Sequence, residues 1–201
     1  AAPRQRRPRS PAPARWTAGS AGRGCPSVSA QRAARSALRI TTTELEDELV
    51  GGILSAGNER LTAAGIMGIP QIISVGALDM VNFGPMDTVP EKFRNRRLHA
   101  HNSNVTLMRT TPEENALLGK EIALKANSAK GATALIFPLR GISALDALGK
   151  PFWWPEANHA LKESLKLGLN PDVEYIELDL HINDTAFGEA CALKLINYLK
   201  D

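Results

Sequence analysis

Compact apolar runs alternate with amphipathic segments from residue 40 onward, and this alternation is the main structural signal of the chain. QIISVG at 71–76 and ATALIFPL at 132–139 have the length and the Gly or Pro flanks of buried strands, and VEYIELDLHI at 173–182 reads as a third strand. Two shorter segments, 40–43 and 98–102, read as the end of a strand and as a short strand. Such apolar runs are typical of parallel strands covered on both faces.

The segments between these runs carry the end signals and the periodicity of helices. The clearest start is at Thr111, which is the N-cap of a capping box with Pro112 at the first helical position and Glu114 closing the box. Helices are expected over residues 44–54, 58–68, 112–129, 143–148, 155–168 and 185–200.

Three expectations concern single elements. Gly51 and Gly52 should lie inside the first helix, where they allow close packing. Residues 79–97, with two prolines and a glycine between polar flanks, should form a long loop. The last helix should bury a stripe spaced by four residues: Phe187, Cys191 and Leu195.

Strands that alternate with helices of ten or more residues predict an α/β fold. The sheet should be open and mostly parallel, with helices on both faces in three layers. No internal repeat is visible, so the pattern argues against a solenoid or a propeller.

Charge divides the chain at residue 40. Residues 1–39 hold nine of the 24 Lys and Arg residues and none of the 21 Asp and Glu residues, so residues 40–201 carry 15 basic and 21 acidic residues, a net charge of −6. The first 39 residues have no periodic apolar face and are rich in Ala, Arg, Ser and Pro, which predicts a disordered leader. A mitochondrial presequence, a basic arm for nucleic acid and a non-native leader are three interpretations of it.

Composition bounds the function of residues 40–201. Their negative charge argues against nucleic-acid binding. No apolar run approaches the roughly 18–20 residues that span a membrane. With only Cys25 and Cys191, a disulfide framework is not expected, and a reducing, cytoplasmic compartment is the default.

The loop PLRGISALD after the second buried strand is the first candidate site, because open α/β sheets bind ligands at the carboxyl ends of their strands. Arg140 can hold phosphate or carboxylate, and Gly141 allows a sharp turn or a close approach. Amides near Ser143 would open a helix N-terminus that attracts anions. The spacing of Ser143 and Asp146 also fits a plain capping box.

Two other loops carry polar residues. Asn183 and Asp184 follow the strand VEYIELDLHI, where Asp184 could also be a plain N-cap. In LHAHN, His99 and His101 share a strand face, but a metal would need a third ligand, and no known zinc spacing is present. Hydrogen-bonded structural histidines are therefore expected and no metal. The common nucleophile-elbow, phosphate-loop and dinucleotide motifs are absent from the sequence.

Five blocks in order resemble the Tm-one-like ATP-binding family, which includes the tomato tobamovirus-resistance protein. They are TTTELEDELVGGILSAG, GIPQIISVGALDMVNFGP, LHAHNSNVTLMRTTPEEN, FPLRGISALD and HINDTAFGEA. The resemblance runs from Thr41 to Leu199 and covers the second of two Rossmann-like halves. It favours the interpretation of residues 1–39 as a non-native leader, because a stretch with its own apolar strands precedes this point in the family.

The resemblance implies further properties. ATP would be held mainly by the other half, and family members tend to form dimers and can bind protein partners. The cleft between the halves would lie at the ends of the strands, which places eight candidate ligand-binding residues there: His101, Asn102, Arg140, Gly141, Ser143, Asp146, Asn183 and Asp184.

Two functions fit this picture. The first is a ligand-binding and protein-interaction domain with no reaction of its own. The second is a hydrolase or lyase for a small anionic substrate, with Arg140 holding the anion and His101 or Asp184 moving a proton.

Overall fold

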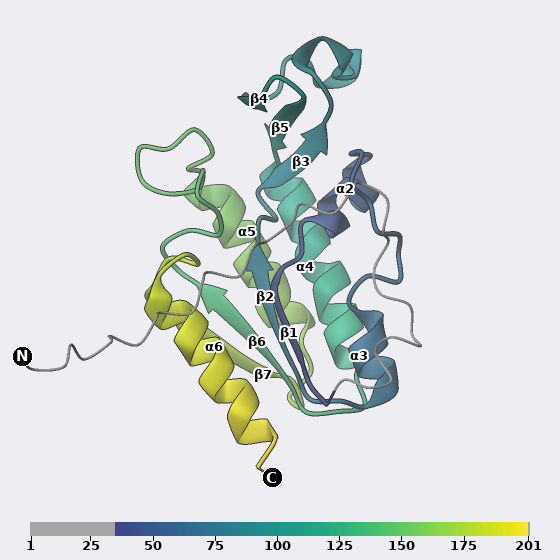
Figure 1. Ribbon diagram of the computed structural model, residues 1–201, viewed down its shortest axis with the longest axis vertical. Helices are drawn as coiled ribbons and strands as arrows, with labels where there is room; N and C mark the ends of the chain where they lie inside the picture. Colours follow the sequence, from purple (N-terminus) through teal and green to yellow (C-terminus); the bar gives the residue numbers. More distant parts are fainter. Residues whose placement is uncertain (1–34, 201) are drawn as a thin grey trace, which may run out of the picture.

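A parallel four-stranded sheet in the order β1-β2-β6-β7 forms the centre of the computed structural model, which describes residues 35–200 (Figure 1). Neighbouring strands pair in parallel throughout. Both central strands, β2 and β6, are buried along their whole length. The strands are β1 (Ala37–Thr41), β2 (Gln71–Gly76), β6 (Thr133–Pro138) and β7 (Glu174–Leu178). The strands expected from the three long apolar runs are confirmed.

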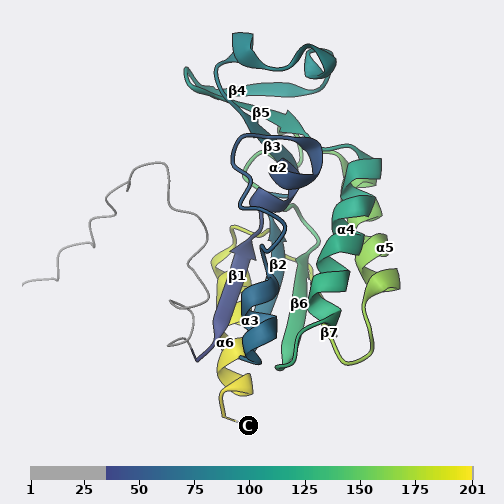
Figure 2. The same cartoon turned by 90° about the vertical axis from the view of Figure 1, so that its right-hand side faces the viewer.

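Helices cover both faces of this sheet, which confirms the three-layer, Rossmann-like α/β class. Figure 2 shows α4 and α5 on one side and α6 on the other, and α3 is in contact with α4. One core lies under α4 and α5, and a second lies between the sheet and α6. The helices are α2 (Glu44–Val50), α3 (Thr62–Met67), α4 (Pro112–Asn127), α5 (Pro155–Gly168) and α6 (Thr185–Tyr198).

A second, antiparallel sheet stands beyond the carboxyl end of the first (Figures 1 and 2). Its order is β3-β5-β4, and its strands are β3 (Met80–Phe83), β4 (Leu98–Asn102) and β5 (Val105–Arg109). The expected strand at 98–102 is confirmed, but the long loop at 79–97 is wrong, because its first residues form β3 and pack a small core with Phe93 and Met108. Two 3-10 turns, η1 (Met86–Thr88) and η2 (Glu91–Phe93), follow it.

The predicted start of α4 is confirmed, whereas the predicted end of α2 is wrong. The capping box of Thr111 and Glu114 forms as expected. In contrast, α2 ends at Val50, because Gly51 takes a left-handed conformation with φ of 100°. The expectation that both glycines lie inside that helix is therefore wrong. Close packing does hold at Gly52, where an added Cβ would lie 1.5 Å from Asp47 Oδ1.

The last helix and the first strand lie near the two ends of the described chain. The stripe of α6 is confirmed, since Phe187, Cys191 and Leu195 are all buried. Strand β1 begins at Ala37, three residues before the expected boundary. The rest of the predicted leader, residues 1–34, lies outside the described residues, so its interpretation stays a prediction. Within residues 35–200, no helix has the length and apolar character needed to cross a bilayer.

Candidate functional site

Three loops meet at the carboxyl edge of the parallel sheet. Ala77, in the loop after β2, donates its amide to the Ile142 carbonyl at 2.9 Å. Ile182, after β7, donates to the Gly141 carbonyl at 3.0 Å. Ala77 also has a positive φ of 61°, a conformation that costs a non-glycine residue free energy. The structure thus brings the predicted loops at 139–146 and 181–184 together and adds the loop after β2.

The loop after β6 contains no helix, so the helix expected over 143–148 is wrong. The anion site expected at its N-terminus stays a prediction. The polar groups of the loop close it on itself. Asp146 Oδ2 accepts the Ile142 amide at 3.0 Å, and Ser143 Oγ accepts the Leu145 amide at 3.0 Å. Gly141 has φ of 135°, and an added Cβ would lie 1.9 Å from the Asp146 carbonyl oxygen. These residues hold the loop in shape.

Arg140 is already paired. Its Nε and Nη2 donate to the two carboxylate oxygens of Asp179 at 2.8 and 2.7 Å, and both side chains are exposed. An incoming anion would have to compete with Asp179 for this guanidinium.

The residues after β7 form a local turn beside that loop. Asp184 is the N-cap residue of α6, but its Oδ2 accepts the His181 amide at 2.8 Å instead of capping the helix. His181 Nδ1 accepts the Asn183 amide at 3.1 Å, so its Nε2–H donates to the Ser143 carbonyl at 3.0 Å. The Asn183 side chain is exposed.

His101 and Asn102 lie elsewhere, on β4 in the antiparallel sheet. Asn102 Oδ1 accepts the Asn104 amide within the β4–β5 turn, and His101 is exposed. No hydrogen bond joins either residue to the three loops within residues 35–200. In that range, no group of three or more His, Cys, Asp or Glu residues could hold a metal ion.

A buried polar network joins the two sheets beneath the carboxyl edge. Its centre is Arg109, at the end of β5, which is completely buried. Arg109 donates to the Phe152 carbonyl at 2.8 Å, to the Thr110 hydroxyl at 2.9 Å and to Asn158 Oδ1 at 2.8 Å. Asn158 in turn donates to Asp146 Oδ2 at 2.7 Å. The guanidinium lies 3.7 Å from the other oxygen of Asp146.

Asp79 completes this network. It is fully buried after β2 and accepts the Ser143 hydroxyl at 2.6 Å. Burial raises the pKa of Asp79 to about 6, although Arg109 acts in the opposite direction. Sequence reasoning did not find Asp79, Arg109 or Asn158. The position of Asp79 soon after a buried strand was a usable signal, whereas nothing local marks the Arg that ends β5.

Because its pKa is raised on folding from 3.8 to about 6, Asp79 should make the protein less stable as pH rises through that interval. The folded state keeps the proton there while the unfolded state loses it. The full effect is about 3 kcal/mol. Asp79→Asn should therefore flatten the free energy of unfolding between pH 4 and 6, measured by urea denaturation.

Asp179→Asn is the contrasting variant for that measurement. Arg140 lowers the pKa of Asp179, so this carboxylate contributes stability that is lost as pH falls. That loss takes place below the ordinary Asp pKa of 3.8, so Asp179→Asn should leave the change in the free energy of unfolding between pH 4 and 6 like that of the wild type. An unchanged profile in Asp79→Asn would show that Asp79 ionises normally in the folded protein.

A recess of about 140 Å³ opens between the end of β6 and the first turns of α5. Trp153 and Pro155 form one wall, and Asn158, His159 and Lys162 reach it from α5. Phe137 in β6 and Leu139 just after it also line the recess. Asn158 connects the recess directly to the buried network.

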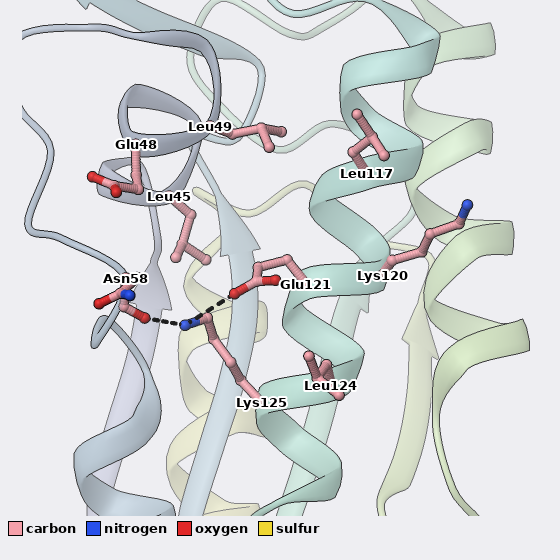
Figure 3. Close-up of a pocket in the computed structure, with 9 residues that line it drawn as sticks. All are labelled: Leu45, Glu48, Leu49, Asn58, Leu117, Lys120, Glu121, Leu124 and Lys125. Atoms are coloured by element: carbon pink, nitrogen blue, oxygen red, sulfur yellow. Dashed lines mark hydrogen bonds and ion pairs between the residues drawn. The ribbon is translucent and has the colours of Figure 1, made fainter.

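An apolar groove of about 290 Å³ lies between α2 and α4 (Figure 3). Leu45 lies at its floor, while Leu49, Leu117 and Leu124 line it and are 43%, 49% and 66% exposed. Glu121 and Lys125 also line it and form an ion pair with each other. The buried face of α4 carries other residues, so this helix is apolar on two sides.

Comparison with known proteins gives consistent matches. Residues 16–199 match the model of the uncharacterised protein family UPF0261, C-terminal domain. A UPF0261 protein of Clostridium tetani is 53% identical over 83% of this chain and 41% of its own length. One of Rhizobium meliloti is 46% identical over 86% of this chain and 44% of its own.

The tomato ToMV resistance protein Tm-1(GCR237) is also similar, with 45% identity over 76% of this chain and 21% of its own length. The chain therefore spans less than half the length of these relatives.

Proposed function

We propose that this chain, which belongs to the UPF0261 family and matches its C-terminal domain, is a ligand-binding and protein-interaction domain. The recess at the carboxyl end of β6 carries the ligand-binding part of this proposal. Ligands of open α/β sheets bind at this edge. The recess is the cavity there that combines apolar walls with polar groups, which is the usual make-up of a ligand pocket.

The candidate residues support binding more than they support a reaction. An enzyme acting on a small anion would use Arg140 with His101 or Asp184. Arg140 is held by Asp179, and His101 lies on the other sheet. The loop residues shape the edge of the sheet: Asp146 bonds to Ser143, Ser143 bonds to Asp79, and the Gly141 carbonyl accepts from Ile182.

We further propose that ATP binds mainly to a part of the full-length family protein outside this chain. The recess is far smaller than the roughly 300–1,000 Å³ of pockets for larger ligands. The isolated chain should therefore show little affinity for ATP.

A thermal-shift panel tests the ligand-binding proposal. It should contain nucleotides, inorganic phosphate, small carboxylates, neutral amides and amines. We expect at least one class of small molecule to raise the melting temperature saturably, because a ligand that binds only the folded state stabilises it. ATP should not.

Trp153→Ala should abolish that shift, because Trp153 lines the recess. Trp154→Ala is the matched control, since Trp154 stacks against Arg97 outside it. If no compound shifts the melting temperature, the ligand-binding proposal fails.

The apolar groove between α2 and α4 supports the proposed protein interaction. We propose that a second copy of the chain occupies it in the predicted homodimer. Exposed leucines gathered in one groove are typical of protein contacts. Leu124→Glu should weaken self-association measured by sedimentation velocity. Leu167→Glu, on α5 and 87% exposed, should leave it unchanged. A monomer at every concentration would contradict the homodimer.

A further inference from the structure

We propose that the recess at the end of β6 binds a ring-sized carboxylate, with its anionic group at Lys162 and His159 and its ring against Trp153. This inference rests on the proposed ligand-binding function and names the class of ligand. It differs from the sequence-based expectation, which placed an anion at Arg140.

The lining of the recess carries positive charge and no negative charge. Lys162 and His159 both line the recess, and no carboxylate does. Within residues 35–200, no hydrogen bond or ion pair occupies the Lys162 ammonium group or the His159 ring. The pKa of Glu177 is lowered partly by Lys162, but this carboxylate is ion-paired with Lys166 at 2.8 Å. An anion entering the recess would therefore displace no existing partner.

The size of the recess fits one ring. Its volume is about 140 Å³, and an engineered protein cavity of about 150 Å³ takes up one benzene molecule. Leu139, Trp153 and Pro155 supply the apolar wall on which a flat ring can lie. A bare phosphate would leave this wall without a partner, and a nucleotide would not fit.

The walls are held in place by contacts that need no ligand. Arg109 and Asp146 fix the two ends of the Asn158 amide. Trp153 is held through its backbone, since its amide donates to the Lys150 carbonyl at 3.1 Å and its carbonyl accepts from Arg97 at 3.3 Å. A preformed wall reduces the ordering cost of binding, so even a small ligand can bind measurably.

Benzoate and benzamide are the probes that test this proposal, because they share one shape and differ in charge. Binding to the full chain is measured by NMR titration for the wild type, Lys162→Met and Arg140→Met. We expect saturable benzoate binding and benzamide binding at least about tenfold weaker. Lys162→Met should weaken benzoate about tenfold, the equivalent of one charge-assisted contact. Arg140→Met should bind like the wild type.

Three results would overturn the proposal. Equal affinity for benzoate and benzamide would show that the recess binds a ring but does not select an anionic group. Loss of benzoate binding in Arg140→Met alone would place the anion at Arg140. Absence of binding by both probes, in a folded protein, would reject the ring-sized carboxylate, while a thermal shift with another compound of the panel would still support the proposed function.

Discussion

Arg109→Met should lower the free energy of unfolding by about 3–5 kcal/mol, the cost of leaving a buried charge without its partner. The side chain is fully buried and donates to Phe152, Thr110 and Asn158. Methionine keeps the aliphatic stem but leaves Asp79 and Asp146 without a buried cation. Urea denaturation at pH 7 measures the loss.

Arg140→Met is the matched control for this variant. It also breaks an Arg–Asp pair, but Arg140 and Asp179 are 61% and 72% exposed at their side chains. Exposed pairs contribute little to stability, so the unfolding midpoint should hardly move. Equal effects of the two variants would contradict the central structural role of the buried network.

Gly141→Ala should be the second severe change, with a loss of about 3 kcal/mol or more from strain and overlap. Its φ of 135° is unfavourable for alanine, and the new Cβ would lie 1.9 Å from the Asp146 carbonyl oxygen. The loop after β6 must shift to relieve this contact, so the adjoining recess should change shape as well. Urea denaturation and a ligand titration measure the two effects.

Gly149→Ala separates backbone strain from overlap. Gly149 also has a positive φ, 78°, but no atom lies within 4 Å of its added Cβ. Its cost should be about 1–2 kcal/mol, the penalty of a left-handed alanine. If Gly141→Ala costs no more than Gly149→Ala, the loop after β6 is more adaptable than its contacts indicate.

The sequence predicted the elements whose signals are local. Continuous apolar runs gave the buried strands β2 and β6, and the capping box at Thr111 marked the start of α4. The helix expected at 143–148 failed because Ser143 and Asp146 bond within a loop, where their spacing has a different use. The strand β3 was missed because prolines and a glycine soon follow it.

The candidate site was less predictable because its partners are distant in the sequence. Arg109 and Asn158 are 49 residues apart, and Ser143 and Asp79 are 64 apart. Nothing in their local sequence shows these contacts. The loop position of Gly141 was predictable from the end of a strand, whereas the pairing of Arg140 with Asp179 depends on which strands are neighbours.

The decisive measurement for ligand binding in the recess is the side-chain indole N–H signal of Trp153, followed by NMR during titration with the most stabilising ligand of the panel. A variant Trp153→Phe assigns that signal among those of the three tryptophans. We expect a saturable shift of the Trp153 signal, with matching amide shifts in the first turns of α5. Saturable shifts confined to the groove around Leu117 and Leu124, with Trp153 unchanged, would contradict ligand binding in the recess.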